Sequence, residues 1–121
     1  MNDKFLIVKY LKIFILNLDD MIINLPRKEL YMKDKLLDTS LEILYSIYEA
    51  NYINDKTLKK QKQIKILSQI HLLDFYIERL YEKKYISEKI CLKKSNELSK
   101  ISKMVYKWIN ESKFTTVKSN L

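Results

Sequence analysis

The sequence predicts an all-α protein, specifically an antiparallel up-down-up-down four-helix bundle. Apolar residues recur every three or four positions in four successive stretches, which is the spacing of amphipathic helices. The 121-residue chain contains no glycine and one proline, whereas tight turns between β-strands usually need glycine. Short polar joints separate the stretches, so consecutive helices are expected to lie antiparallel. A chain of this length suits one domain, with residues 1–111 as the bundle and residues 112–121 as a polar C-terminal tail.

The first two helices are predicted at about residues 3–24 and 28–52. The pair Leu25-Pro26 ends the first helix, because proline disfavours the helical conformation in the residue before it. The second helix has a stripe that we expect to face the core, formed by Leu30, Leu37, Leu41, Leu44, Tyr48 and Asn51 or Tyr52. Its other side is expected to be a solvated acidic face, formed by Asp34, Asp38, Glu42, Tyr45 and Glu49.

The last two helices are predicted at about residues 56–84 and 87–110. Asn54 or Asp55 is placed to cap the third helix, and Ser87 is placed to cap the fourth. The expected core stripe of the third helix is Ile66, Ile70, Leu73, Ile77 and Leu80. That of the fourth helix is Ile90, Lys94, Leu98, Ile101, Val105 and Trp108.

Two helices have a second apolar face that a single bundle does not require. On the first helix this face is formed by Leu6, Ile13, Leu16 and Ile23. On the third helix it is formed by Ile64, His71, Leu72, Phe75 and Tyr76. Sizeable exposed apolar patches usually mark a partner surface, so we expect both faces to pack against another copy of the chain. The alternative is that long, tilted helices use wide apolar stripes within one bundle.

The residue types needed for catalysis are sparse. Cys91 is the only cysteine and His71 the only histidine, which excludes an intrachain disulfide and a Cys/His metal site within one chain. Without glycine there is neither a Walker loop nor a dinucleotide-binding turn. Asp74 lies near the core stripe of its helix, where a buried acid needs a basic or hydrogen-bonding partner, and Lys94 is a candidate for that partner. We therefore expect no enzyme activity, no catalytic residues, no metal and no cofactor.

The basic charge belongs to the second half of the chain. The formal net charge is +8. Residues 1–54 contain seven Lys/Arg and eight Asp/Glu, a net charge of −1, whereas residues 55–121 contain sixteen and seven, a net charge of +9. Such a one-sided field suits a polyanion such as nucleic acid. The alternative is that a coding bias places lysine at every exposed position.

The candidate nucleic-acid-binding residues form a lysine stripe opposite the core stripe of the fourth helix, together with both ends of the third helix. The stripe contains Lys89, Lys93, Lys100, Lys103 and Lys107. The third helix adds Lys56, Lys59, Lys60, Lys62, Lys65, Arg79, Lys83 and Lys84. Lysines on a rigid helix contact phosphates as point charges and do not read base sequence. With few exposed aromatic residues expected, recognition of particular bases is not predicted.

The location expected from the sequence is cytoplasmic. The apolar run at residues 5–18 is interrupted by Lys9 and Lys12, so it is too short and too charged to span a bilayer. It also lacks the small-residue cleavage pattern of a signal peptide. Binding to an anionic membrane surface is a weaker alternative, because the lysine stripe is backed by a core stripe and not by an exposed apolar face.

Three stretches of the chain resemble a known family. These are LIVKYLKIFILNLDDMIINLPRK at residues 6–28, the junction EANY followed by Asp55-Lys56, and ELSKISKMVYKWI at residues 97–109. They resemble the accessory variability determinant (Avd) of diversity-generating retroelements and the related four-helix proteins encoded in ribosomal-RNA intervening sequences. The resemblance implies a homopentameric, basic barrel of bundles that binds RNA or DNA and partners a reverse transcriptase during mutagenic reverse transcription.

Some positions of the family pattern can be carried over to this chain. Pro26-Arg27-Lys28 looks like the joint between the first two helices of the family, and Lys100, Lys103 and Lys107 precede its terminal Trp-Ile. The family often has glycine just before that Trp, where this chain has Lys107, and it has more arginine in its basic surface.

Two hypotheses of function follow. In the first, the chain is a non-enzymatic accessory protein of a retroelement, an oligomeric basic scaffold for RNA and a reverse transcriptase. In the second, it is an interaction module, or an intervening-sequence four-helix protein, that binds protein only through the apolar faces of the first and third helices, while its lysines serve solubility.

Overall fold

A computed structural model describes residues 3–119 of the chain, with side chains described for residues 6–19 and 21–111. Over these residues the structure contains helices and turns and no strand, which confirms the all-α prediction. Four longer helices, one short helix and one 3-10 turn follow in the order α1 (Asp3–Leu16), α2 (Asp19–Ile22), η1 (Arg27–Glu29), α3 (Leu30–Tyr52), α4 (Lys56–Glu82) and α5 (Glu88–Ser119).

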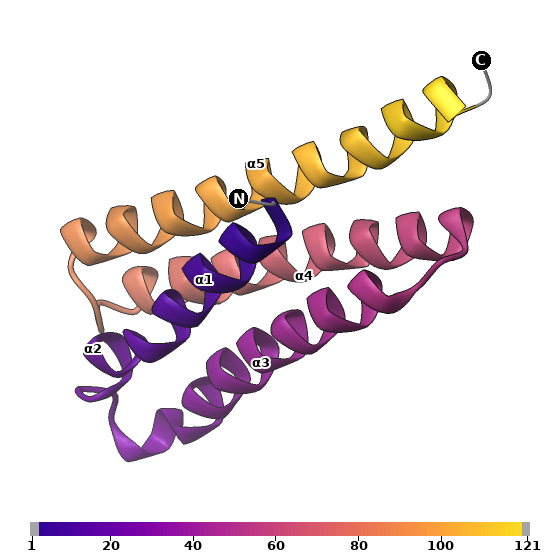
Figure 1. The fold of residues 1–121 in the computed structure, drawn as a ribbon. Coiled ribbons are helices and arrows are strands. Elements are labelled where there is room, and N and C mark those ends of the chain that lie inside the picture. The colour runs from indigo at the N-terminus through magenta and orange to yellow at the C-terminus, as the bar shows by residue number, and fades with distance from the viewer. Residues whose placement is uncertain (1–2, 120–121) are drawn as a thin grey trace.

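The four longer helices surround one hydrophobic core. Both α1 and α4 pack against α3 and α5, so each longer helix contacts two others (Figure 1). The predicted core stripes of α4 and α5 are confirmed, because their apolar members are buried apart from the partly buried Ile90. The most deeply buried side chains include Leu11, Phe14, Leu36, Ile43, Ile66, Ile70, Leu73, Ile77, Leu98 and Val105.

Both predicted N-caps of the later helices are present. The backbone N–H of Leu58 donates to Asp55 Oδ1 at 2.9 Å, and that of Ile90 donates to Ser87 Oγ at 3.1 Å. At the other end of α4 the chain turns through Lys84, whose φ of 65° is left-handed. The N–H of Tyr85 there donates to the Leu80 carbonyl at 2.9 Å, which is the hydrogen bond that closes a Schellman motif. Glycine usually occupies this position, and lysine takes it in a chain without glycine.

The first predicted helix is interrupted after Leu16, and a buried lysine forms a hydrogen bond at the break. After Leu16 the N–H of Met21 donates to Leu18 at 2.9 Å, so the carbonyl of Asn17 is released from the usual helical ladder. Lys94 Nζ reaches this carbonyl from α5 at 3.3 Å. Lys94 also lies 3.7 Å from Glu97 Oε2 and 5.5 Å from the centre of the Phe14 ring. The buried ammonium group therefore satisfies the carbonyl that the break exposes.

The prediction of which side of α3 faces the core is wrong. Leu30, Leu37, Leu41, Tyr48 and Tyr52 are exposed, and Leu44 is partly buried. Asp34 lies on the same side of the helix, so burying that stripe would place a carboxylate in the core. The side that packs inward holds no charged residue and consists of Met32, Leu36, Thr39, Ser40, Ile43, Ser46, Ile47 and Ala50.

The last helix is longer than the sequence predicted. The expected end was near residue 110, with a polar tail at residues 112–121, whereas α5 extends to Ser119. The other helix bounds lie within a few residues of those predicted, apart from the break after Leu16.

Candidate nucleic-acid interface

Five exposed lysines lie along the outer side of α5. We call Lys89, Lys93, Lys100, Lys103 and Lys107 the α5 lysine row. Lys94 lies in the same part of α5 but is buried, because it belongs to the core stripe of this helix. The row therefore lies on the solvent side of a helix whose opposite side is fixed in the core, so the lysine positions are held by a rigid backbone.

Two members of the row have defined neighbours. Lys100 Nζ lies 4.2 Å from the centre of the Tyr10 ring of α1, a cation–π contact that keeps the charge at the surface. Lys107 Nζ lies 4.0 Å from Glu111 Oε1, one turn further along α5. Neither contact removes the side chain from solvent, because both lysines remain exposed.

The lysines at the start of α4 add to this positive surface. Lys56, Lys60 and Lys65 are exposed and Lys59 is partly exposed. The start of α4 lies at the same end of the bundle as the last turns of α5 (Figure 1). These four lysines thus stay candidate phosphate contacts at this end of the bundle.

Three predicted phosphate contacts are instead engaged with α3 and η1. Lys62 Nζ pairs with Glu49 at 2.7 Å, Arg79 donates to the Tyr31 hydroxyl at 3.4 Å, and Lys83 pairs with Glu29 at 3.1 Å. Lys62 and Arg79 on α4, and Lys83 just after it, thus contact side chains of α3 and η1. Their periodicity in the sequence did not distinguish them from the exposed lysines. Lys84 is exposed in the turn after α4.

The Lys83 pair belongs to a small polar cluster that ties η1 to the end of α4. Glu29 is buried, and its Oε1 accepts hydrogen bonds from Lys83 Nζ and from the Tyr85 hydroxyl, both at 3.1 Å. The hydrogen bond from Lys83 is the main reason why the pKa of Glu29 lies below its ordinary value. Burial, together with the bond to Glu29, raises the pKa of Tyr85.

Glu29→Gln is expected to remove a pH-dependent part of the stability. Because the folded-state pKa of Glu29 lies below its ordinary value of 4.5, its ionised form stabilises the fold above that pH. The contribution is lost as the pH falls through the lower folded-state pKa. The free energies of unfolding of wild type and variant, measured by urea unfolding followed by circular dichroism, should therefore converge as the pH is lowered from about 7 to about 3. Glu42→Gln, at an exposed position of α3, is the control. If the free energies of unfolding of wild type and Glu29→Gln differ by the same amount across this pH range, the assignment is contradicted.

The other chemical candidates are packing features. Asp74 accepts a hydrogen bond from Ser95 Oγ at 2.7 Å, so its partner is Ser95 and the candidate pairing with Lys94 is wrong. Lys94 points across the core to α1, whereas Ser95 lies on the side of α5 next to α4. Burial, and next the charge of Asp74, raise the pKa of the Cys91 thiol, which disfavours the reactive thiolate. Among the described residues no group of three or more His, Cys, Asp or Glu side chains is placed to hold a metal ion.

Most of the predicted oligomer-interface residues are exposed. On α1 and just beyond α2, Leu16 and Ile23 are 75% and 77% exposed, and Ile13 is also exposed. Ile64, His71, Leu72 and Phe75 are exposed on α4. Leu6 and Tyr76 are only partly exposed, and Tyr76 packs against the core.

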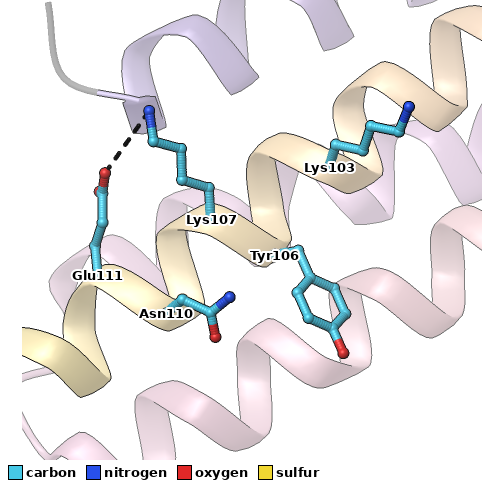
Figure 2. Close-up of a pocket in the computed structure, with 5 residues that line it drawn as sticks. All are labelled: Lys103, Tyr106, Lys107, Asn110 and Glu111. Atoms are coloured by element: carbon cyan, nitrogen blue, oxygen red, sulfur yellow. Dashed lines mark ion pairs between the residues drawn. The ribbon is translucent and has the colours of Figure 1, made fainter.

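One exposed aromatic residue beside the lysine row was missed at the sequence level. Tyr106 is 61% exposed, and it lines an open surface pocket of about 570 Å³ together with Lys103, Lys107, Asn110 and Glu111 (Figure 2). The spacing of residues 103, 106, 107 and 110 places all four on one face of a helix. That spacing is the signal that could have found the pocket, but only the lysines of this face were considered and Tyr106 was not.

No family model, no curated protein and no solved structure matches this chain. In the part of the chain that the structure describes, none of the helices has the length and apolar character needed to cross a membrane.

Proposed function

We propose that this chain is a non-enzymatic, cytoplasmic accessory protein of a diversity-generating retroelement that binds RNA or DNA and a reverse transcriptase. The observation that carries the nucleic-acid part is the α5 lysine row, five exposed lysines on one side of a rigid helix. The retroelement and the reverse transcriptase come from the resemblance to the Avd family. The role is that of a positively charged scaffold for RNA during mutagenic reverse transcription.

The scaffold in this proposal is an antiparallel up-down-up-down bundle. The short joint of residues 53–55 between α3 and α4, and that of residues 83–87 between α4 and α5, support this topology. The contacts of α1 with both α3 and α5 close the bundle. In this arrangement the row follows one outer edge of the bundle from the start of α5 to Lys107.

Binding through the row is electrostatic and independent of base sequence. Each lysine that neutralises a phosphate releases a condensed counterion, which favours binding at low salt. Lysine ammonium groups act as point charges and lack the planar, paired donors with which arginine recognises guanine. The row therefore serves to hold RNA in place, and pairing between nucleic-acid strands supplies the sequence specificity.

The proposal includes a homo-oligomer, with a pentamer as the expected form. The exposed apolar residues of α1 and α4 support it, and α3 adds the exposed face that the sequence had assigned to the core. The α1 face also carries exposed Lys9 and Lys12, whereas the α3 face carries exposed Asp34 and Asp38. Lys9 and Lys12 of one copy can therefore pair with Asp34 and Asp38 of the next when the α1 face packs against the α3 face.

A titration of wild-type protein with RNA at rising salt tests the nucleic-acid part. If three to five lysines of the row contact phosphates, the logarithm of the affinity for single-stranded RNA should fall against log salt with a slope of about −2 to −4. The measurement is fluorescence anisotropy of a labelled oligonucleotide from about 50 to about 200 mM salt. Absence of binding at the lowest salt would count against the proposal.

The alternative, a module that binds protein only, is favoured by one observation. The exposed side of α3 carries Leu30, Leu37 and Leu41 followed by Tyr45, Tyr48 and Tyr52, and tyrosine is enriched in protein interfaces. Under this alternative the lysines keep the chain in solution, and the titration shows no RNA binding at any salt concentration.

A further inference from the structure

The pocket around Tyr106 combines the groups that bind an unpaired nucleotide. Figure 2 shows Lys103 and Lys107 extending to one side of α5, while the ring of Tyr106 and the amide of Asn110 lie on the other. Both lysines belong to the α5 lysine row. The same two turns of α5 thus carry an aromatic ring and an amide on one side and two lysines of the row on the other.

The exposure of Tyr106 is not explained by the packing of the bundle. The core positions of this part of α5 are filled by Ile101, Val105 and Trp108, all of which are buried. Tyr106 is 61% exposed, and among the described residues none forms a hydrogen bond with its hydroxyl. A large aromatic side chain that neither packs in the core nor bonds within the fold is available to a ligand.

We propose that the Tyr106 pocket binds the base of an unpaired nucleotide, so that the lysine row prefers single-stranded RNA or DNA over a duplex. This inference rests on the proposed function, because the lysines of the row supply the phosphate contacts. The ring of Tyr106 stacks on a base, which every base permits because each has a flat π-face. In a duplex the bases are stacked within the helix and cannot reach the ring.

The neighbouring side chains fit this ligand. Lys103 and Lys107 are one turn apart, a rise of about 6 Å along the helix axis, so their ammonium groups can contact neighbouring phosphates of one strand. The Asn110 amide offers both a donor and an acceptor to a base edge. Glu111 pairs with Lys107 at 4.0 Å and orients that side chain without cancelling the charges of Lys100 and Lys103.

The test compares Tyr106→Ala with two controls. Tyr106→Phe keeps the ring, and Tyr81→Ala removes an exposed tyrosine near the end of α4 that belongs to neither the lysine row nor the proposed oligomer faces. The probes are a labelled oligouridylate of about 12 nucleotides and a blunt RNA duplex with a similar number of phosphates. Tyr106→Ala should weaken binding of the oligouridylate about tenfold and leave duplex binding and both salt slopes unchanged. Both controls should bind like the wild type.

The outcomes separate this inference from the proposed function. Equal affinity of Tyr106→Ala and wild type for the oligouridylate, or an equal loss for both probes, overturns the role of Tyr106 while the lysine row stands. A wild type that binds neither probe at low salt overturns both proposals. Quenching of 2-aminopurine placed in the single strand, seen with wild type and Tyr106→Phe but lost in Tyr106→Ala, gives an independent readout of stacking.

Discussion

The triple variant Lys93→Glu, Lys100→Glu, Lys103→Glu is expected to bind RNA about 1000-fold more weakly than the wild type at about 50 mM salt. All three side chains are exposed on α5. Each lysine that contacts a phosphate of single-stranded RNA contributes about 0.7 to the slope of log affinity against log salt. Losing three contacts should therefore reduce the steepness of the slope by about two, and the added carboxylates repel the remaining phosphates.

The matched control reverses three basic residues away from the row. Arg27, Lys28 and Lys35 are exposed on η1 and α3, so their replacement by Glu changes the net charge by the same amount. If the row is the binding surface, this control loses far less affinity than the row variant. Equal losses would mean that overall charge, and not the row, attracts the RNA.

The row variant should remain folded, which makes the comparison interpretable. Lys93 and Lys103 are exposed, and Lys100 contributes only its cation–π contact with Tyr10, worth about 0.5–1 kcal/mol at an exposed site. Circular dichroism should show unchanged helicity at room temperature. A variant that has lost its helical signal would not test the row, and the three single variants would then replace it.

The sequence predicted the core sides of α4 and α5 well because the longest regular stripe of each helix is apolar, with Lys94 of α5 as the one charged member. Ile66, Ile70 and Leu73 on α4 are buried as expected, and so are Leu98 and Ile101 on α5. The caps were also predictable, since Asp55 and Ser87 directly precede their helices and act through local hydrogen bonds. Local chemistry and a simple pattern point to the same answer in this half of the chain.

On α3 the same method failed because two stripes compete. The larger apolar residues lie on the side of Asp34, whereas the buried side includes Ser40, Ser46 and Ala50. Small residues allow a close approach of helices, and Ser40 satisfies its hydroxyl by donating to the Leu36 carbonyl at 2.6 Å. A ranking by hydrophobic size chooses the wrong side, while a ranking by the absence of charge chooses the right one.

Contacts distant in the sequence explain the remaining differences. The break after Leu16 is stabilised by Lys94, which lies 77 residues beyond the carbonyl of Asn17 that it satisfies. The partners of Lys62, Arg79 and Lys83 lie on α3 and η1, far away in the sequence. The sequence therefore offered no reason to separate these three residues from the other basic residues. No local pattern identifies such a partner. For the candidate site this means that the exposure of the row was predictable from the α5 pattern alone. Which basic residues of α4 have partners within the fold was not predictable.

Reversing the charges on either the α1 face or the α3 face is expected to dissociate the proposed oligomer. Reversing both is expected to restore it. The apolar residues of α3 are flanked by exposed Asp34 and Asp38, and those of α1 by exposed Lys9 and Lys12. In the variant Lys9→Glu, Lys12→Glu both faces are acidic, and in Asp34→Lys, Asp38→Lys both are basic. Like charges placed together at an interface cost several kcal/mol, so each variant should dissociate to monomers at micromolar concentration.

The variant that carries all four substitutions is the decisive control. Its α1 face is acidic and its α3 face is basic, so the two faces are complementary again and the native mass measured by light scattering should return to that of the wild type. Net charge alone cannot explain dissociation of both double variants, because one lowers the net charge of the wild type and the other raises it by the same amount. A wild type that is monomeric at micromolar concentration would refute the oligomer itself.

An equal mixture of the two double variants shows whether the proposed ring has an odd number of copies. A contact between unlike faces of successive copies is heterologous and can close into a ring. In the mixture only contacts between different variants are complementary, so copies must alternate. A ring with an even number of copies can alternate completely, whereas a pentamer keeps at least one contact between like charges. A pentamer therefore predicts that the fourfold variant recovers the wild-type mass and that the mixture does not, while recovery in both would indicate an even ring.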